Sequence, residues 1–102
     1  MILACIALGP ARAQADTVSD WGFITWMSTG WTVDSIAAIT TAPLANDGCS
    51  VSNAGYATNP EDPGHQLHAS MLMMAFAMNK QVQILVSGCV FQKPRIISVS
   101  IH

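Results

Sequence analysis

The sequence predicts a mainly β domain with a single α-helix (an α+β fold), placed between the third and fourth of five strands. The helix is indicated by the stretch that begins at His65, which is almost entirely apolar until Asn79. Short segments rich in aromatic and β-branched residues indicate strands on either side of it. Three of these segments precede the helix, at residues 21–31, 33–41 and 49–53, and two follow it, at residues 81–87 and 95–101. We therefore expect a single domain over residues 16–102.

Residues 1–15 have the pattern of a secretory signal peptide. A short apolar run, Ile2 to Leu8, is broken by Gly9 and Pro10, and Ala13-Gln14-Ala15 has the small-x-small form of a cleavage site. The basic segment that normally precedes such a run is missing, so we expect a signal that is truncated at its start. The alternative is that this run forms a first core strand.

Charge and cysteine content restrict the partners and the compartment. Residues 16–102 carry three basic side chains against six acidic ones, which gives a formal net charge of −3. Domains that bind nucleic acid usually carry a basic patch, so we expect no nucleic-acid partner. The same residues include two cysteines, Cys49 and Cys89, and this even count in a secreted chain favours a disulfide. The expected location is secreted or periplasmic.

The first predicted strand, residues 21–31, has apolar side chains on both faces. In strict alternation, one face carries Trp21, Phe23, Thr25, Met27 and Trp31. The other face carries Ile24 and Trp26. One of these faces is therefore expected to be covered by something outside the sheet. The segments after the helix alternate too, with Val82, Ile84 and Val86 inward and with Ile97, Val99 and Ile101 on one face.

The predicted helix has clear end signals. Asp62 is a favourable N-cap residue and Pro63 a favourable first helical residue. Asn79 suits the left-handed position that ends many helices, and Lys80 follows where a cation is favourable. The helix is thus expected to run from Pro63 to about Met78.

This helix is apolar on every side, so its whole circumference should be buried. Its apolar run is about half of the ~20 residues that a membrane span needs, and we expect no membrane span. One face can pack on the sheet of the same chain, whereas the other needs a neighbouring chain. The residues expected at that subunit interface are His68, Met71, Met74 and Met78.

Three strands, a helix and two strands is the order of the OB-fold, a five-stranded Greek-key barrel with a helix at one end. Several stretches also resemble the B subunits of subtilase cytotoxin and typhoid toxin, which belong to the pertussis-like group of pentameric toxin-binding subunits. These stretches are Ser19-Asp20, Gly48 to Ser52, the proline-bearing loop with the helix that follows, and Asn79 to Val86. Gly88-Cys89 and Pro94 to Ile97 resemble a broader set of small secreted proteins on the same plan. The likeness covers most of residues 16–102, at low identity.

The resemblance implies an OB-fold, a homopentameric ring with helices lining its pore, glycan binding on the outer face and an enzymatic A subunit as partner. It also implies that the Ser19 hydroxyl meets the glycan. The toxin subunits pair the cysteine of the third strand with one in the second strand, which has none here, so Cys89 is the expected partner of Cys49. Gln83 stands where the typhoid-type subunit has an arginine, which weakens the case for a sialic acid carboxylate.

The sequence offers little support for catalysis. No serine lies in a Gly-x-Ser-x-Gly elbow, and Glu61-Asp62 is best explained as a helix-start device. His65 and His68 lie three residues apart, but no third or fourth zinc ligand accompanies them. We therefore expect no enzyme, no metal and no cofactor.

Glycan recognition has more support, because sugars stack on aromatic rings and are oriented by a few polar groups. The available rings are Trp21, Trp26, Trp31 and Tyr56, although most such rings fill cores or interfaces. Trp26 is the best candidate for exposure, because it is out of phase with the other aromatic residues of its strand. The predicted glycan contacts are Ser19, Asp20, Trp26, Tyr56 and Gln83.

The sequence therefore predicts a secreted, non-catalytic binding domain that recognises a glycan and forms a ring like a toxin B subunit. The alternative is a stand-alone periplasmic or extracellular interaction domain with another ligand.

Overall fold

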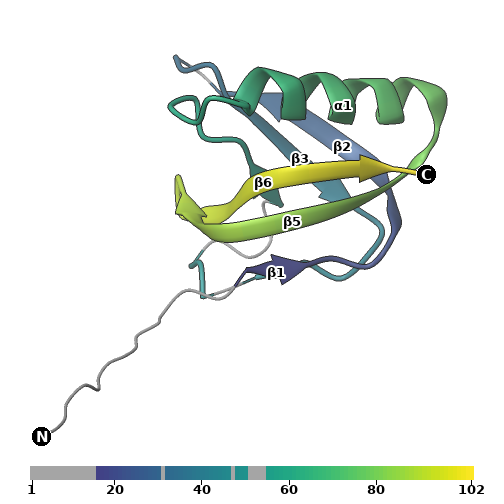
Figure 1. The fold of residues 1–102 in the computed structure, drawn as a ribbon, viewed down its shortest axis with the longest axis horizontal. Helices are drawn as coiled ribbons and strands as arrows, with labels where there is room; N and C mark the ends of the chain where they lie inside the picture. The colour runs from purple at the N-terminus through teal and green to yellow at the C-terminus, as the bar shows by residue number, and fades with distance from the viewer. Residues whose placement is uncertain (1–15, 31, 47, 51–54) are drawn as a thin grey trace, which may run out of the picture.

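The computed structural model describes residues 16–30, 32–46, 48–50 and 55–102. This part of the chain is mainly β with one helix, as predicted. Its elements are β1 (Thr17–Val18), β2 (Gly22–Thr29), β3 (Ile36–Thr40), β4 (Tyr56–Ala57), α1 (His65–Met78), β5 (Gln81–Val90) and β6 (Lys93–Ile101) (Figure 1).

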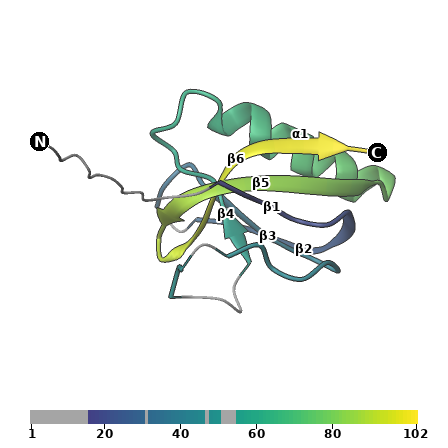
Figure 2. The same ribbon diagram turned by 60° about the horizontal axis from the view of Figure 1, so that its bottom comes forward.

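The sheet closes around β5. One edge of β5 pairs antiparallel with β6, and the other edge pairs with β2 near Gly22 and with β1 near Val18. β2 then pairs with β3, and β3 with β4. A parallel pairing of Ala57 with Arg95 joins β4 to β6. The pairings thus return to β5, so five strands follow a closed path, and β1 lies beside β5 as a short additional strand (Figure 2).

Apolar side chains from the strands and the helix meet inside this sheet. The alternation predicted for β5 is confirmed, because Val82, Ile84 and Val86 are buried. α1 contributes Leu72 and Ala75, and the helix lies along one side of the sheet against β6 and β2 (Figure 1). The other members of the core are Ile24, Ala38, Ala45, Tyr56, Ile96 and Val99.

A bulge in β2 changes the faces that were predicted for it. Ile24 pairs with Thr40 and Trp26 with Ile39, so Thr25 is an extra residue in this strand. Ile24 is buried and Met27 packs against the core. The prediction that Phe23 and Met27 share a face is therefore wrong, because a one-residue shift exchanges the two faces of a strand.

β6 contains the same kind of irregularity. Ile96 pairs with Val86 and Ser98 with Leu85, so Ile97 is the extra residue. As a result Ile96 is fully buried, and Val99 is buried on the same strand. The prediction that Ile97 shares a face with Val99 and Ile101 is therefore wrong at Ile97.

Several predicted boundaries also change. The second strand begins at Ile36 and not at residue 33, and β5 continues to Val90, beyond the predicted end at Ser87. Cys49 lies outside any strand, and residues 51–54 of the predicted third strand lie outside the described residues. The third strand of the closed path is instead β4, where Gly55 precedes Tyr56 with a φ of 79°. A Cβ at Gly55 would overlap the Ala38 carbonyl oxygen, so only glycine allows β4 to approach β3 this closely.

The helix begins later than predicted. Asp62 is not its N-cap, because the Asp62 carbonyl accepts a hydrogen bond from the His65 N–H (3.2 Å) and the helix starts at His65 after Gly64. The Asp62 carboxylate instead forms an ion pair with Arg95 of β6 at 3.4 Å. This contact ties the segment before α1 to the sheet.

The predicted end of the helix is confirmed. Asn79 has φ 54° and ψ 49°, which is the left-handed conformation. The Asn79 N–H donates to the Phe76 carbonyl and the Lys80 N–H donates to the Ala75 carbonyl, which together form a Schellman motif. The chain then enters β5 at once. Within the described residues, no helix is long and apolar enough to cross a membrane.

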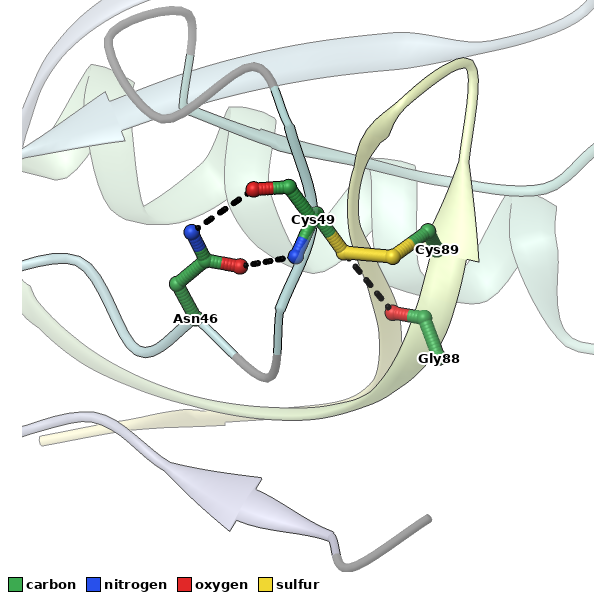
Figure 3. Close-up of a disulfide and its surroundings, with 4 residues drawn as sticks. All are labelled: Asn46, Cys49, Gly88 and Cys89. Atoms are coloured by element: carbon green, nitrogen blue, oxygen red, sulfur yellow. Dashed lines mark hydrogen bonds between the residues drawn. A yellow bond between two sulfur atoms is a disulfide. The ribbon is translucent and has the colours of Figure 1, made fainter. Parts of the chain in front are cut away.

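A disulfide joins Cys49 to Cys89, as predicted, with the two Cα atoms 5.8 Å apart (Figure 3). The Asn46 side chain holds the backbone of Cys49 on both sides: its Oδ1 accepts from the Cys49 N–H at 2.8 Å, and its Nδ2 donates to the Cys49 carbonyl at 3.1 Å. The Cys49 sulfur lies 3.5 Å from the Gly88 carbonyl oxygen. The link therefore anchors the segment after β3 to the distal part of β5.

Removal of this link should destabilise the domain. The two cysteines are 40 residues apart, and closing a loop of that length contributes about 3–4 kcal/mol in the chain-entropy model. We expect a Cys49→Ser/Cys89→Ser double variant to lose about that much free energy of unfolding in a urea titration. The reduced wild-type protein is the matched control and should unfold at the same urea concentration as the variant. A loss below about 1 kcal/mol would contradict the prediction.

Candidate functional site

An open hollow of about 530 Å³ lies where the β2–β3 connection approaches the turn between β5 and β6. These two connections lie at the same end of the barrel, on the left in Figure 1. We call this space the aromatic hollow, because two exposed aromatic residues, Trp26 and Phe91, line it. The other lining residues are Ser28, Thr29, Gly30, Thr32, Val33, Ser35, Ala37, Ala57 and Lys93.

Trp26 is exposed, as predicted, although the bulge in β2 is what makes it so. Its exposed fraction is 45%. Because Thr25 is the extra residue of the bulge, Ile24 and Met27 can both pack inward while Trp26 stays on the outside. A tryptophan held on a paired strand offers a large ring at little cost in conformational entropy.

Phe91 lies in the turn between β5 and β6, in an uncommon backbone conformation. Val90 pairs with Lys93, so Phe91 and Gln92 are the two central residues of the turn. Their φ angles are 51° and 67°, in a turn type that usually carries Asn or Gly. A bulky residue in this region costs on the order of 1–3 kcal/mol, and such strain is concentrated at functional sites. The strained turn keeps an aromatic side chain, 47% exposed, at the hollow.

Lys93 gives the aromatic hollow its charge. It is the only charged residue among the described lining residues, and it begins β6 directly after the turn. Hydroxyl groups of Ser28 and Thr32 lie on the same lining. The hollow thus combines two aromatic rings, a cation and several hydroxyls, which is the set of groups that a sugar ring with an acidic substituent requires.

Two residues predicted to contact a glycan, Ser19 and Tyr56, are buried and use their polar groups within the protein. The Ser19 hydroxyl accepts from the Ile84 N–H (3.0 Å) and donates to the Asp20 carbonyl (2.9 Å). The Tyr56 hydroxyl accepts from the Ala45 N–H at 2.8 Å. Burial raises the pKa of Tyr56, and the hydrogen bond from the Ala45 N–H opposes this rise. Both residues therefore act as structural groups here.

The remaining predicted contacts are separated from Trp26. Asp20 is exposed beside Ser19, and Gln83 is half-buried on β5, where it pairs with Ser100. Neither of them lines the aromatic hollow. Ser19 is held instead beside Ile84 of β5, because the Ser19 N–H donates to the carbonyl of Ile84 at 2.8 Å.

The other two tryptophans are Trp21 and Trp31. Trp21 is 40% exposed and lies against the His102 ring, with a centroid distance of 5.2 Å, outside the aromatic hollow. Trp31, which was predicted as a possible platform, lies outside the described residues. Sequence reasoning missed Phe91 and Lys93; the only signal was a two-residue turn between alternating strands.

The outer face of α1 carries a second feature. Five large apolar side chains of the helix are exposed: Leu67, Met73, Met74, Phe76 and Met78. The helix has no charged aspartate, glutamate, lysine or arginine between His65 and Met78. Of the residues predicted at a subunit interface, Met74 and Met78 are exposed, whereas Met71 packs partly against the core of its own chain. This face is apolar and lacks a cover within the described part of the chain.

His68, the fourth predicted interface residue, is half-buried near the start of the helix. Burial lowers the pKa of His68, Asp62 opposes this effect and His65 adds to it. The neutral imidazole is therefore favoured in the folded domain. Among the residues that the structure describes, no three His, Cys, Asp or Glu side chains are grouped so that they could hold a metal ion.

Comparisons of the chain with models of protein families, with curated proteins and with solved structures found no match.

The structural role of Ser19 can be separated from a binding role. We expect Ser19→Ala to lower the free energy of unfolding by about 1–3 kcal/mol, because the Ile84 N–H loses its buried acceptor. The affinity for any ligand of the aromatic hollow should stay unchanged. Chemical denaturation and ligand titration measure the two quantities, and exposed Ser100→Ala serves as the control. If Ser19→Ala kept normal stability but lost affinity for the ligand, the prediction would be wrong and Ser19 would belong to the binding site.

Proposed function

We propose that this protein is a secreted, non-catalytic domain that binds an acidic glycan in the aromatic hollow. The observation that carries the proposal is the meeting of Trp26, Phe91 and Lys93 on one hollow. Aromatic rings pack against the C–H faces of sugars, and a cation pairs with a carboxylate or sulfate. The volume of about 530 Å³ lies within the range of about 300–1,000 Å³ that is usual for ligand sites.

The position of the hollow supports the proposal. We infer that the barrel is of the OB type, with β2, β3, β4, β5 and β6 as its five strands. Three observations support an OB-type barrel: the closed pairing path, the parallel pairing of β4 with β6 and the helix between β4 and β5. OB-folds bind oligosaccharides and oligonucleotides with the face of their second and third strands and the loops after the first and fourth. The β2–β3 connection and the β5–β6 turn correspond to those loops.

The disulfide supports secretion, and the surroundings of Ser35 support a non-catalytic role. The disulfide is typical of an oxidising compartment, which fits the signal-like pattern of residues 1–15. The Ser35 hydroxyl donates a hydrogen bond of 2.7 Å to the Thr58 carbonyl, and the described lining of the aromatic hollow includes no histidine, aspartate or glutamate that could activate it. The net charge of −3 outside residues 1–15 favours a glycan over a nucleic acid.

We further propose that copies of the chain assemble through the exposed apolar face of α1. Large uncovered apolar surfaces on soluble proteins mark interaction sites, and an uncharged face can meet its own copy without repulsion. The resemblance to pentameric toxin subunits makes a ring of five the favoured assembly and an enzymatic subunit a further partner. The second candidate is a stand-alone interaction domain, in which the same face binds a different protein.

Replacement of the central ring tests the binding site. We expect Trp26→Ala to weaken binding of acidic glycans about 30-fold, since a tryptophan anchor contributes about 2 kcal/mol. The test begins with a glycan array of sialylated, uronate-containing, sulfated and neutral glycans and continues with calorimetric titration. Trp21→Ala is the matched control, because Trp21 is similarly exposed but lies outside the hollow. Absence of acidic glycans among the array ligands, or equal effects of the two variants, would refute the proposal.

A charge on the helix tests the assembly. We expect Met74→Lys to raise the dissociation constant of the oligomer by about tenfold or more, because the interface would bury an unpaired charge. Light scattering under non-reducing conditions measures the mass, and Ser100→Lys, at an exposed position on β6, is the control. A wild-type protein that stays monomeric at all concentrations would rule out self-assembly and leave the stand-alone domain.

A further inference from the structure

A second hollow adjoins the aromatic hollow. It has a volume of about 450 Å³, and four residues, Thr29, Gly30, Val33 and Ser35, line both spaces. We call it the polar hollow, because its remaining lining includes Asp34, His65 and Gln66, together with Ile36, Thr58 and Ala69. The two hollows therefore adjoin at the β2–β3 connection, where Val33 lines both.

The two hollows differ in chemistry. The aromatic hollow offers rings and the Lys93 cation, whereas the polar hollow offers a carboxylate, an amide and an imidazole. Asp34 would repel an acidic group and accept hydrogen bonds from sugar hydroxyls, and Gln66 can both donate and accept. An acidic sugar thus fits beside Lys93, and a neutral, hydroxyl-rich sugar fits beside Asp34 and Gln66.

Hydrogen bonds hold both ends of the β2–β3 connection, at Gly30 and at Ser35. The Gly30 N–H donates to the Ser35 carbonyl at 2.8 Å, which closes the connection at its base. The Ser35 hydroxyl donates to the Thr58 carbonyl (2.7 Å), and the Ile36 N–H donates to the Thr58 hydroxyl (2.9 Å). These contacts hold Gly30 and Ser35, two residues that line both hollows, so a ligand need not first order these two positions.

Val33 completes the path between them. It is 43% exposed and lines both hollows, so its apolar side chain lies where a glycosidic linkage would pass from one space to the other. Each hollow alone has the volume of a site for a drug-sized ligand, which is larger than one sugar ring. A single monosaccharide would leave the second space to solvent.

We propose that the ligand is an oligosaccharide that spans both hollows, with an acidic sugar in the aromatic hollow and neutral sugars in the polar hollow. This inference rests on the proposed glycan-binding function and adds the length and direction of the ligand. Affinity therefore rises with chain length until the polar hollow is filled. The polar hollow contributes only when the ligand is long enough to pass Val33.

The test uses two series of acidic oligosaccharides. One series is aldobiouronic, aldotriouronic and aldotetraouronic acid, in which a single glucuronic acid is joined to one, two or three neutral xyloses. The other series is sialic acid, sialyllactose and sialyl-lacto-N-tetraose. Each is titrated against the wild-type protein, Gln66→Ala and Ser70→Ala. Gln66 and Ser70 are both exposed on α1, but only Gln66 lines the polar hollow, so Ser70→Ala is the matched control. Thermal unfolding verifies that all three proteins are folded.

We expect Gln66→Ala to leave the affinity for the shortest member unchanged and to weaken binding of the longest about three- to tenfold, as one hydrogen bond would. Ser70→Ala should match the wild type throughout. Affinity that is independent of length, with Gln66→Ala equal to wild type, would overturn the two-hollow ligand while leaving the binding function intact. Failure of the wild type to bind any member of either series would overturn the acidic-glycan function, and this inference with it.

Discussion

The disulfide between Cys49 and Cys89 is the constraint on which the rest of the domain depends. The core consists of a few side chains from short strands and one helix, and a domain of this size buries only a modest fraction of its surface. The two cysteines are 40 positions apart and the segment between them includes β4 and α1, so the link limits how far these elements can separate from the sheet. Because Cys89 lies two residues before Phe91, the same link also steadies the turn at the aromatic hollow.

This reinforcement explains how the hollow can contain features that reduce stability. Phe91 has a left-handed backbone, and the bulge at Thr25 interrupts the pairing of β2 with β3. Both irregularities serve the same end of the barrel, where they leave aromatic side chains on the surface. A conflict between local preference and the overall fold is most often found at a functional site, where the rest of the structure compensates for it. The two irregularities therefore support one functional explanation better than two unrelated ones.

Features that are marked by residue type or by an alternating pattern could be predicted from the sequence, whereas features that depend on strand register could not. The inward face of β5, the helix end at Asn79 and the disulfide follow from alternation, a single asparagine and an even cysteine count. The bulges at Thr25 and Ile97 have no marker in the sequence, yet each exchanges the faces of a strand. Ser19 illustrates the same limit for the site, because its burial depends on a partner 65 residues away. Phe91 was missed because the sequence does not reveal its positive φ.

The open hollow and the apolar helix face complement each other. A glycan in an open site keeps much of its solvent contact, so a single copy of the chain is expected to bind weakly. Assembly would place several hollows on one particle, and the second binding event would then be intramolecular, which can raise the overall affinity by about 10²–10⁴. The layout of α1 is compatible with both roles, since His65 and Gln66 at its start line the polar hollow, whereas Met74 and Met78 are exposed toward its end. Contacts through that end would leave both hollows accessible, so association could supply the affinity that one open site lacks.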